Sequence, residues 1–429
     1  MTNSETKNFS QNVSSSYHLE DRDKCNKNTC ANTCNVPKLR FKGYNVEWKK
    51  VRTEEIFENV TIKNKPSLPV LAVTQERGTI LRESCGINIK YENESLKSYK
   101  LVKPGNFIIS LRSFQGGLEY SGLEGIVSPA YTILNNKQSI SYDFFKYYFK
   151  TYNFIKSLNI AVEGIRDGKQ ISYNSFKDIK ITFPNIEEQE KIASFLTLID
   201  KKIEKQKELV ELLKKYKRGL LSAIFSQKLK FKDDNGNDYP AWEEKSLGEV
   251  TGNISYGLNA ASKDYDGENK YIRITDIDET TGKFNNLDIV SPDCVLSDDY
   301  KLKINDLLFA RTGASTGKTY LYNENDGKMY FAGFLIKFSI KNEYCSNFIF
   351  YITQTFNYKK WVSIMSARSG QPGINAKEYS NYKFSCPVYD EQVKISNIIS
   401  KLDNIIEKEN ILLDSYNDYK KGLLQKLFI

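Results

Sequence analysis

Two stretches of the chain, 184–227 and 387–429, carry apolar residues at alternating intervals of three and four. In the first stretch, the two interleaved heptad series are Ile192, Ile199, Gln206, Leu213, Leu220 and Leu196, Ile203, Val210, Lys217, Ile224. In the second stretch, they are Ile395, Leu402, Glu409, Tyr416, Leu423 and Ile399, Ile406, Leu413, Lys420, Leu427. Mostly aliphatic seams with charged flanks, sustained over five heptads, predict two long helices that form a coiled coil.

The two stretches are copies of each other at a constant offset of 203 residues. Pro184 matches Pro387, Asp200 matches Asp403, and the Gly-Leu-Leu at 219–221 matches that at 422–424. A repeat this long is not a stacked solenoid unit. It indicates a duplicated module in which a globular domain is followed by a long helix.

The segments before each helix predict two similar domains of mixed α and β structure. Each contains a strand-like apolar run that ends in an arginine, at 107–112 and 307–311, and later an aromatic helix, at 142–148 and 346–351. We therefore expect an α+β fold with a leader, a first domain, a first helix, a second domain and a second helix. The expected limits of these segments are 1–36, 37–183, 184–227, 228–386 and 387–429.

Chain order predicts the direction of the helices. The second domain begins where the first helix ends, and the second helix begins where that domain ends, so paired helices run antiparallel. Gln206 and Glu409 interrupt the seams at their centres, and a shared polar layer there would fix the register. About 40 residues make a rod on the order of 60 Å long, with the two domains related by a pseudo-two-fold axis. The alternative is that each helix packs on its own domain.

Composition narrows the classes of function. The formal net charge is +9, which suits a polyanionic partner without requiring one. Histidine occurs once, at His18, which excludes a histidine base or a multi-histidine metal site in the domains. The seven cysteines have no repeated spacing, so we expect reduced thiols. No apolar run is long enough to cross a bilayer and no signal pattern opens the chain, so a cytoplasmic protein with no membrane partner is expected.

The leader 1–36 is polar and is expected to be disordered. It contains Cys25, Cys30 and Cys34 downstream of His18. This spacing fits no common zinc finger, which favours a flexible tail with incidental thiols and no metal.

Glycine-containing basic loops are the candidate nucleic-acid contacts. The loop 313–319, Gly-Ala-Ser-Thr-Gly-Lys-Thr, is one residue short of a phosphate-binding loop. It is either a basic loop that approaches DNA or a plain turn. The loops 164–171 and 367–374 place arginine and glutamine among glycines, and these side chains can pair with guanine and adenine; alternatively they are merely solvated. The residues predicted to contact DNA are Arg112, Arg166, Lys169, Arg311, Lys318, Arg368 and Gln371.

No catalytic cluster is duplicated with the domains. The chain lacks an Asn/Asp-Pro-Pro-Tyr tetrapeptide for amino-methyl transfer, a Phe-x-Gly-x-Gly loop and a repeated nuclease pattern. A duplicated chain without a duplicated catalytic cluster is typical of a binding protein.

Two variable domains alternating with two near-identical helices resemble the DNA specificity subunit of type I restriction–modification enzymes. Each helix opens Pro-x-x-x-Glu-Gln-x-x-Ile and closes Lys-x-Gly-Leu-Leu, and Arg311-Thr312-Gly313 and Gly370-Gln371-Pro372 also match. The resemblance covers about residues 37–429, without the leader. The first half departs from it at both loops, with Arg112-Ser113-Phe114 and Gly168-Lys169-Gln170.

The resemblance implies that each domain reads one half of a bipartite DNA target, while the helices set the spacing. It implies further that the helices dock two modification subunits, which carry S-adenosylmethionine and methylate adenine, and that restriction subunits that use ATP join the complex. The chain itself would hold no cofactor and catalyse nothing. The residues expected in the coiled coil and in subunit docking are Ile192, Leu196, Ile199, Ile203, Gln206, Val210, Leu213, Ile395, Ile399, Leu402, Ile406, Glu409 and Leu413. The alternative is a non-catalytic coiled-coil scaffold whose paired domains bind proteins.

Overall fold

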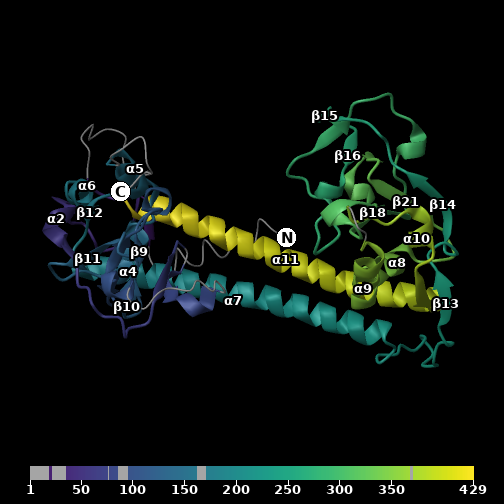
Figure 1. The fold of residues 1–429 in the computed structure, drawn as a ribbon, viewed down its shortest axis with the longest axis horizontal. Coiled ribbons are helices and arrows are strands. Elements are labelled where there is room, and N and C mark those ends of the chain that lie inside the picture. Colours follow the sequence, from purple (N-terminus) through teal and green to yellow (C-terminus); the bar gives the residue numbers. More distant parts are fainter. Residues whose placement is uncertain (1–18, 22–34, 76, 86–94, 162–170, 368–370) are drawn as a thin grey trace. The chain divides into compact units, whose positions relative to one another are not determined.

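The computed structural model describes residues 19–21, 35–75, 77–85, 95–161, 171–367 and 371–429 (Figure 1). Its contacts divide the chain into two compact units. Unit 1 consists of Met1–Glu208 and Glu409–Ile429, and unit 2 of Leu209–Lys408. Each unit therefore contains one of the mixed domains and about half of each long helix. Because these units cut across both helices, the domain limits expected from the sequence stay predictions.

Unit 1 is built on a four-stranded antiparallel sheet with the strand order β4-β11-β8-β9. The strands of unit 1 are β1 (Leu19–Asp21), β2 (Leu39–Phe41), β3 (Lys49–Arg52), β4 (Phe57–Val60), β5 (Leu71–Thr74), β6 (Gly78–Leu81), β7 (Lys100–Val102), β8 (Phe107–Ile109), β9 (Glu119–Tyr120), β10 (Gly125–Val127), β11 (Thr132–Asn136) and β12 (Lys180–Phe183). Its short helices are α2 (Thr53–Ile56), α3 (Ser113–Gly116), α4 (Tyr142–Tyr148), α5 (Tyr152–Ile160) and α6 (Tyr173–Lys177). The aromatic helix expected at 142–148 is α4, and its Phe144 and Phe145 are fully buried.

Unit 2 has a sheet of the same design, with the order β14-β21-β18-β19. The strands of unit 2 are β13 (Glu243–Ser246), β14 (Thr251–Tyr256), β15 (Ser262–Asp264), β16 (Lys270–Ile272), β17 (Val290–Pro292), β18 (Asp306–Ala310), β19 (Thr319–Leu321), β20 (Met329–Phe331), β21 (Leu335–Ile340) and β22 (Lys383–Cys386). Its short helices are α8 (Ser346–Ile352), α9 (Phe356–Met365) and α10 (Ala376–Ser380). The strand-like run before Arg311 is β18, which is buried along its whole length.

The two long helices are α7 (Ile186–Phe225) and α11 (Tyr389–Leu427). In unit 1, the C-terminal end of α11 lies beside the N-terminal half of α7, since Lys420 of α11 pairs with Asp200 of α7 at 2.6 Å. In unit 2, Lys217 of α7 pairs in the same way with Asp403 of α11, also at 2.6 Å. The antiparallel direction is confirmed, and with it the fold class. The expected polar layer is also confirmed, because Gln206 Nε2 donates to Glu409 Oε2 at 2.5 Å.

The helix ends also pack on the domains, but not each helix on its own domain as in the alternative interpretation, because each domain core includes residues of both helices. The aromatic core of unit 1 includes Ile192, Leu196 and Ile199 of α7 together with Leu427 and Phe428 at the other end of the chain. The core of unit 2 likewise includes Leu221 and Ile224 of α7 with Ile395 and Ile399 of α11. The apolar residues of the heptad pattern therefore make two kinds of contact: some pack against the other helix and some pack against a domain.

The whole leader was expected to be disordered, but one part of it is ordered. Residues Leu19–Asp21 form β1, which pairs antiparallel with β2. A short edge strand needs only backbone groups for this pairing, so the polar composition of the leader gave no sign of it. His18, Cys25, Cys30 and Cys34 lie outside the described residues. Across the described ranges, the long helices are too polar to cross a membrane, and no other helix is long enough.

Candidate nucleic-acid interface

The Glu-Gln pair that opens each long helix fastens that helix to its domain. Gln189 Nε2 donates to the Pro184 carbonyl at 2.8 Å, and its Oε1 accepts from the Ser141 backbone N–H, at the start of α4, at 3.0 Å. Gln392 repeats both contacts in unit 2, with the Pro387 carbonyl at 2.8 Å and the Cys345 N–H at 2.9 Å. The repeated Gln is therefore a structural residue.

The preceding glutamate is buried in both units but has a different partner in each. In unit 1, the Arg40 guanidinium holds Glu188 through two bonds of 2.7 Å, and both side chains are only 2% exposed. In unit 2, Glu391 accepts from Trp242 Nε1 at 3.0 Å, and burial raises the pKa of Glu391 while this bond opposes the rise. Two copies of one motif thus use different chemistry to satisfy the same carboxylate.

A tyrosine completes each ion pair between the helices. Tyr147 of α4 donates its hydroxyl to Asp200 at 2.7 Å, and the Lys420 ammonium lies 5.6 Å from the centre of the Tyr147 ring. Lys217 lies 5.5 Å from the Tyr351 ring in the same way, and burial lowers the pKa of Lys217 against the opposing effect of Asp403. These contacts fix the position of each domain on the two helix ends that it packs against.

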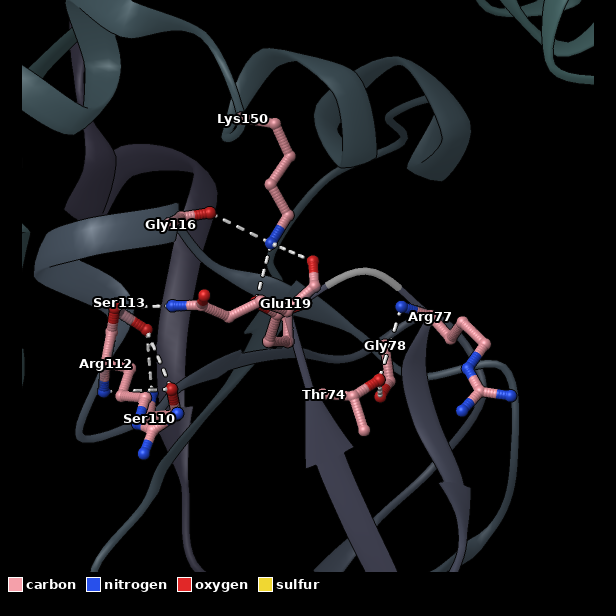
Figure 2. A network of polar contacts seen from close by, with 10 residues as sticks. Thr74, Arg77, Gly78, Ser110, Arg112, Ser113, Gly116, Glu119 and Lys150 are labelled. Atoms are coloured by element: carbon pink, nitrogen blue, oxygen red, sulfur yellow. Dashed lines mark hydrogen bonds and ion pairs between the residues drawn. The ribbon is translucent and has the colours of Figure 1, made fainter. Parts of the chain in front are cut away.

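In unit 1, the loop after β8 is held by a partly buried ion pair between Lys150 and Glu119 (Figure 2). Lys150 Nζ donates to Glu119 at 2.6 Å, to the Gly116 carbonyl at 3.0 Å and to the Gln75 carbonyl at 3.1 Å. Burial raises the pKa of Glu119 and lowers that of Lys150, while their mutual attraction opposes both shifts. Lys150 therefore stabilises the loop, whereas Arg112 is exposed on the surface of the loop.

A second exposed arginine, Arg77, lies on the turn that packs against this loop, and sequence reasoning missed it. The Gln75 side chain donates to the Arg112 carbonyl at 3.2 Å, and the Arg77 N–H donates to Thr74 Oγ1 at 3.2 Å within the β5–β6 turn. Figure 2 shows the two turns side by side. Nothing in the local pattern of 74–78 distinguishes this arginine from an ordinary turn residue.

In unit 2, two of the predicted loops come together. The Gly313 N–H donates to the Pro372 carbonyl at 2.9 Å, and Ile374 N–H donates to the Arg311 carbonyl at 2.9 Å. Gly313 has a φ of +70°, and a Cβ there would lie 3.2 Å from Gln371 Nε2. Arg311 and the exposed Gln371 are thereby brought to one site, although the sequence separates them by 60 positions.

Lys318 lies beside an exposed carboxylate. Its ammonium lies 3.6 Å from the Glu279 carboxylate and lines a hollow of about 260 Å³ beside α9. The Thr316, Gly317 and Lys318 N–H groups donate to the carbonyls of Gly313, Ala310 and Ser315. Because these N–H groups are already bonded, the loop does not cradle a phosphate as a nucleotide-binding loop does.

The other predicted side chains fall into two groups. Arg166, Lys169 and Arg368 lie outside the described residues. Most seam residues named for subunit docking are buried, so they pack the helices and are not a free surface; this is true of Ile192, Leu196, Ile199, Gln206, Val210, Ile395, Ile399, Leu402 and Ile406, while Ile203, Leu213, Glu409 and Leu413 are half-buried. The exposed apolar side chains of α7 in unit 2 are instead Leu209, Leu212 and Tyr216.

The chemistry of the site is recognition by cations and amides. Exposed Arg112 and Arg77 in unit 1, and Arg311 with Gln371 in unit 2, offer the donors and acceptors that read phosphates and base edges. Among the residues that the structure describes, no group of three or more His, Cys, Asp or Glu could hold a metal ion.

Comparison with known proteins gives a consistent result. Residues 45–214 and 239–414 both match the family model of the type I restriction modification DNA specificity domain. The chain is 24% identical over 352 residues to the type I restriction enzyme MjaVIII specificity subunit of Methanocaldococcus jannaschii, covering 76% of this chain and 79% of that protein. It is 24% identical over 267 residues to the type I restriction enzyme StySPI specificity subunit of Salmonella potsdam, covering 59% and 58%. The solved type I restriction–modification S subunit from M. genitalium has the same fold, with a TM-score of 0.54 at 16% identity over 92% of this chain and 99% of that one.

Proposed function

This chain belongs to the family of type I restriction modification DNA specificity domains and is a specificity subunit of a type I restriction–modification system, and we propose that its two units read the two halves of a bipartite DNA target. The observation that carries the proposal is that each unit has an arginine loop bonded to a second polar turn, with a different turn in each unit. In both, a buried central strand, β8 or β18, leads into a loop with an arginine, and that loop is bonded to a second polar turn. Because these loops differ in sequence between the two units, each unit is suited to read a different half-site.

In this proposal, the helices set the spacing between the two half-sites and dock two modification subunits. The surface for docking is the exposed apolar stripe of α7 formed by Leu209, Leu212 and Tyr216, which lie at helical spacings of three and four. Exposed apolar stripes of this kind mark interaction sites. Restriction subunits join the same assembly.

The chemistry is assigned to the partner subunits. S-adenosylmethionine, ATP, the methyl transfer and the cleavage belong to them, and this chain supplies recognition without catalysis. Membership of the family does not favour the alternative of a scaffold whose domains bind only proteins.

Co-expression with the modification subunit, followed by mapping of methylated adenines, tests the proposal. One bipartite motif with a fixed gap is expected. Methylation that is absent, or that follows a single continuous motif, contradicts the proposal.

The spacing role has its own test, and the structure determines its design. Because Gln206 bonds to Glu409, a heptad added to α7 alone would break the register, so one heptad is added to both α7 and α11. The gap in the methylated motif should lengthen while both half-sites stay the same. An unchanged gap contradicts the spacing role.

A further inference from the structure

Arg311 is held by an aromatic ring and retains hydrogen-bonding capacity. Its guanidinium carbon lies 5.1 Å from the centre of the Tyr256 ring. Its Nε is buried and has no hydrogen-bond acceptor among the described residues. A guanidinium held by a cation–π contact with a ring is restrained in advance, so less freedom is lost when it binds.

Tyr256 also holds the second loop of the site. Its hydroxyl accepts a hydrogen bond at 3.2 Å from the Ala376 N–H, the first residue of α10 and five positions after Gln371. One side chain at the end of β14 thus contacts both the arginine that follows β18 and the helix that follows the Gln371 loop.

The surroundings of Arg311 suit contact with a base. It lines an open hollow of about 660 Å³ together with Tyr256, Leu258, Tyr271 and Phe334. Phe334 is 56% exposed, and its carbonyl accepts from the Arg311 N–H at 3.0 Å. The other cation of the hollow, Arg273, is neutralised by Asp276 and Asp288, each at 2.9 Å. Aromatic and aliphatic side chains beside a guanidinium that lines an open hollow suit contact with a base edge, and arginine paired with guanine is the commonest specific contact of this kind.

We propose that Tyr256 is the positioning residue of unit 2, which orients Arg311 to bind the N7 and O6 acceptors of a guanine in the half-site that unit 2 reads. The inference rests on the proposed function. It adds which base is read, guanine, and which residue orients the arginine that reads it. Arg311 touches the base, and Tyr256 acts through Arg311 and through the start of α10.

The test uses the full chain in complex with its modification subunits and duplexes that carry the mapped motif. The variants are Tyr256→Leu, which removes the ring, Tyr256→Phe, which keeps the ring and removes the acceptor for Ala376, and Arg311→Ala. Tyr265→Leu, at an exposed tyrosine of the same unit, is the matched control. Binding is measured for the motif, for each single base-pair change and for duplexes with 7-deazaguanine, which lacks the N7 acceptor.

Tyr256→Leu and Arg311→Ala should both lose ~5- to 150-fold of discrimination at one and the same G·C pair, as expected for a bidentate contact. Tyr256→Phe should keep more of it than Tyr256→Leu. 7-Deazaguanine at that position should weaken the wild-type complex and not Arg311→Ala. Reading of the other half-site should be unchanged in every variant, which shows that unit 1 is intact. Unchanged discrimination at the remaining base pairs of the half-site read by unit 2 shows that unit 2 is folded.

Full discrimination by Tyr256→Leu overturns the positioning role. A uniform loss over all sequences with a shallower salt dependence overturns the guanine contact and indicates a phosphate contact. If the wild-type complex itself binds DNA without sequence preference, the proposed function fails, which is a different result from either of these.

Discussion

Gln206 on α7 donates a hydrogen bond to the Glu409 carboxylate on α11 at 2.5 Å and a second to the Glu409 backbone carbonyl at 3.1 Å. The two residues occupy equivalent positions in the duplicated helices, so each copy of the helix contributes one half of the layer. A polar layer within an aliphatic seam has a correct partner in only one register, and it therefore specifies alignment at some cost in stability.

Replacement of Gln206 by Leu should destabilise the protein by about 1–3 kcal/mol, because the Glu409 carboxylate loses its donor while half-buried. The double variant with Glu409→Leu should recover that loss, since an aliphatic layer needs no partner. Urea unfolding measures both, with Lys207→Leu on the exposed face of α7 as the control. A single variant as stable as the wild type would show that the layer does not hold the helices in register.

Arg40→Met should destabilise unit 1 by about 3–5 kcal/mol, because the Glu188 carboxylate would remain buried without its partner. Arg40→Met combined with Glu188→Met should be far less harmful. Lys230 occupies the corresponding place in the second copy and is exposed, so Lys230→Met is the matched control and should change stability by at most about 0.5 kcal/mol. Denaturant unfolding measures the free energy of unfolding of the three variants. Equal losses for Arg40→Met and Lys230→Met would contradict the prediction.

Alkaline pH should destabilise unit 1 through Tyr148. Burial raises the pKa of Tyr148 to about 12, against about 10 for an unfolded tyrosine. Below pH ~10 both states keep the proton; between ~10 and ~12 only the unfolded state releases it, so stability falls by about 2–3 kcal/mol over that range.

Tyr148→Phe has no proton to release, so its unfolding midpoint in urea should fall less steeply between about pH 9 and pH 11.5 than that of the wild type. The variant also loses the acceptor for the Thr182 N–H, which lowers its stability at all pH values, and the slope is therefore the quantity compared. Tyr152→Phe, at a tyrosine that is 70% exposed, should keep the wild-type slope. Equal slopes for all three proteins would contradict the prediction.

Leu212→Glu and Tyr216→Glu should abolish co-purification with the modification subunit and leave the fold intact. Both side chains are more than 60% exposed, at 63% and 61%, so a charge there disturbs a partner rather than a core. Val295→Glu, at an isolated exposed apolar residue elsewhere in unit 2, is the control. If the modification subunit still co-purifies with both helix variants, docking takes place on another surface.

The sequence predicted the helices well and the interface only in part. Arg311 was identified as the arginine that ends a strand-like run before a glycine-containing loop, and Gln371 as a glutamine among glycines that suits base reading; the structure brings their loops together. Arg77 and Tyr256 were missed, since each is an unremarkable residue at a strand end until its neighbours are known. Lys318 was favoured by its loop sequence, but Glu279, about 40 positions away, lies against it.

The amino-acid sequence by itself determined the duplication, the two long helices, their opposite directions and the polar layer at their centres. These properties follow from a heptad period and from chain order, which require no knowledge of distant contacts. Only the tertiary structure decided which group satisfies each buried glutamate, which seam residues pack on a domain and which arginine keeps free donors. Those outcomes depend on residues far apart in the chain, such as Arg40 and Glu188 at a separation of 148, whose proximity is a property of the folded domain.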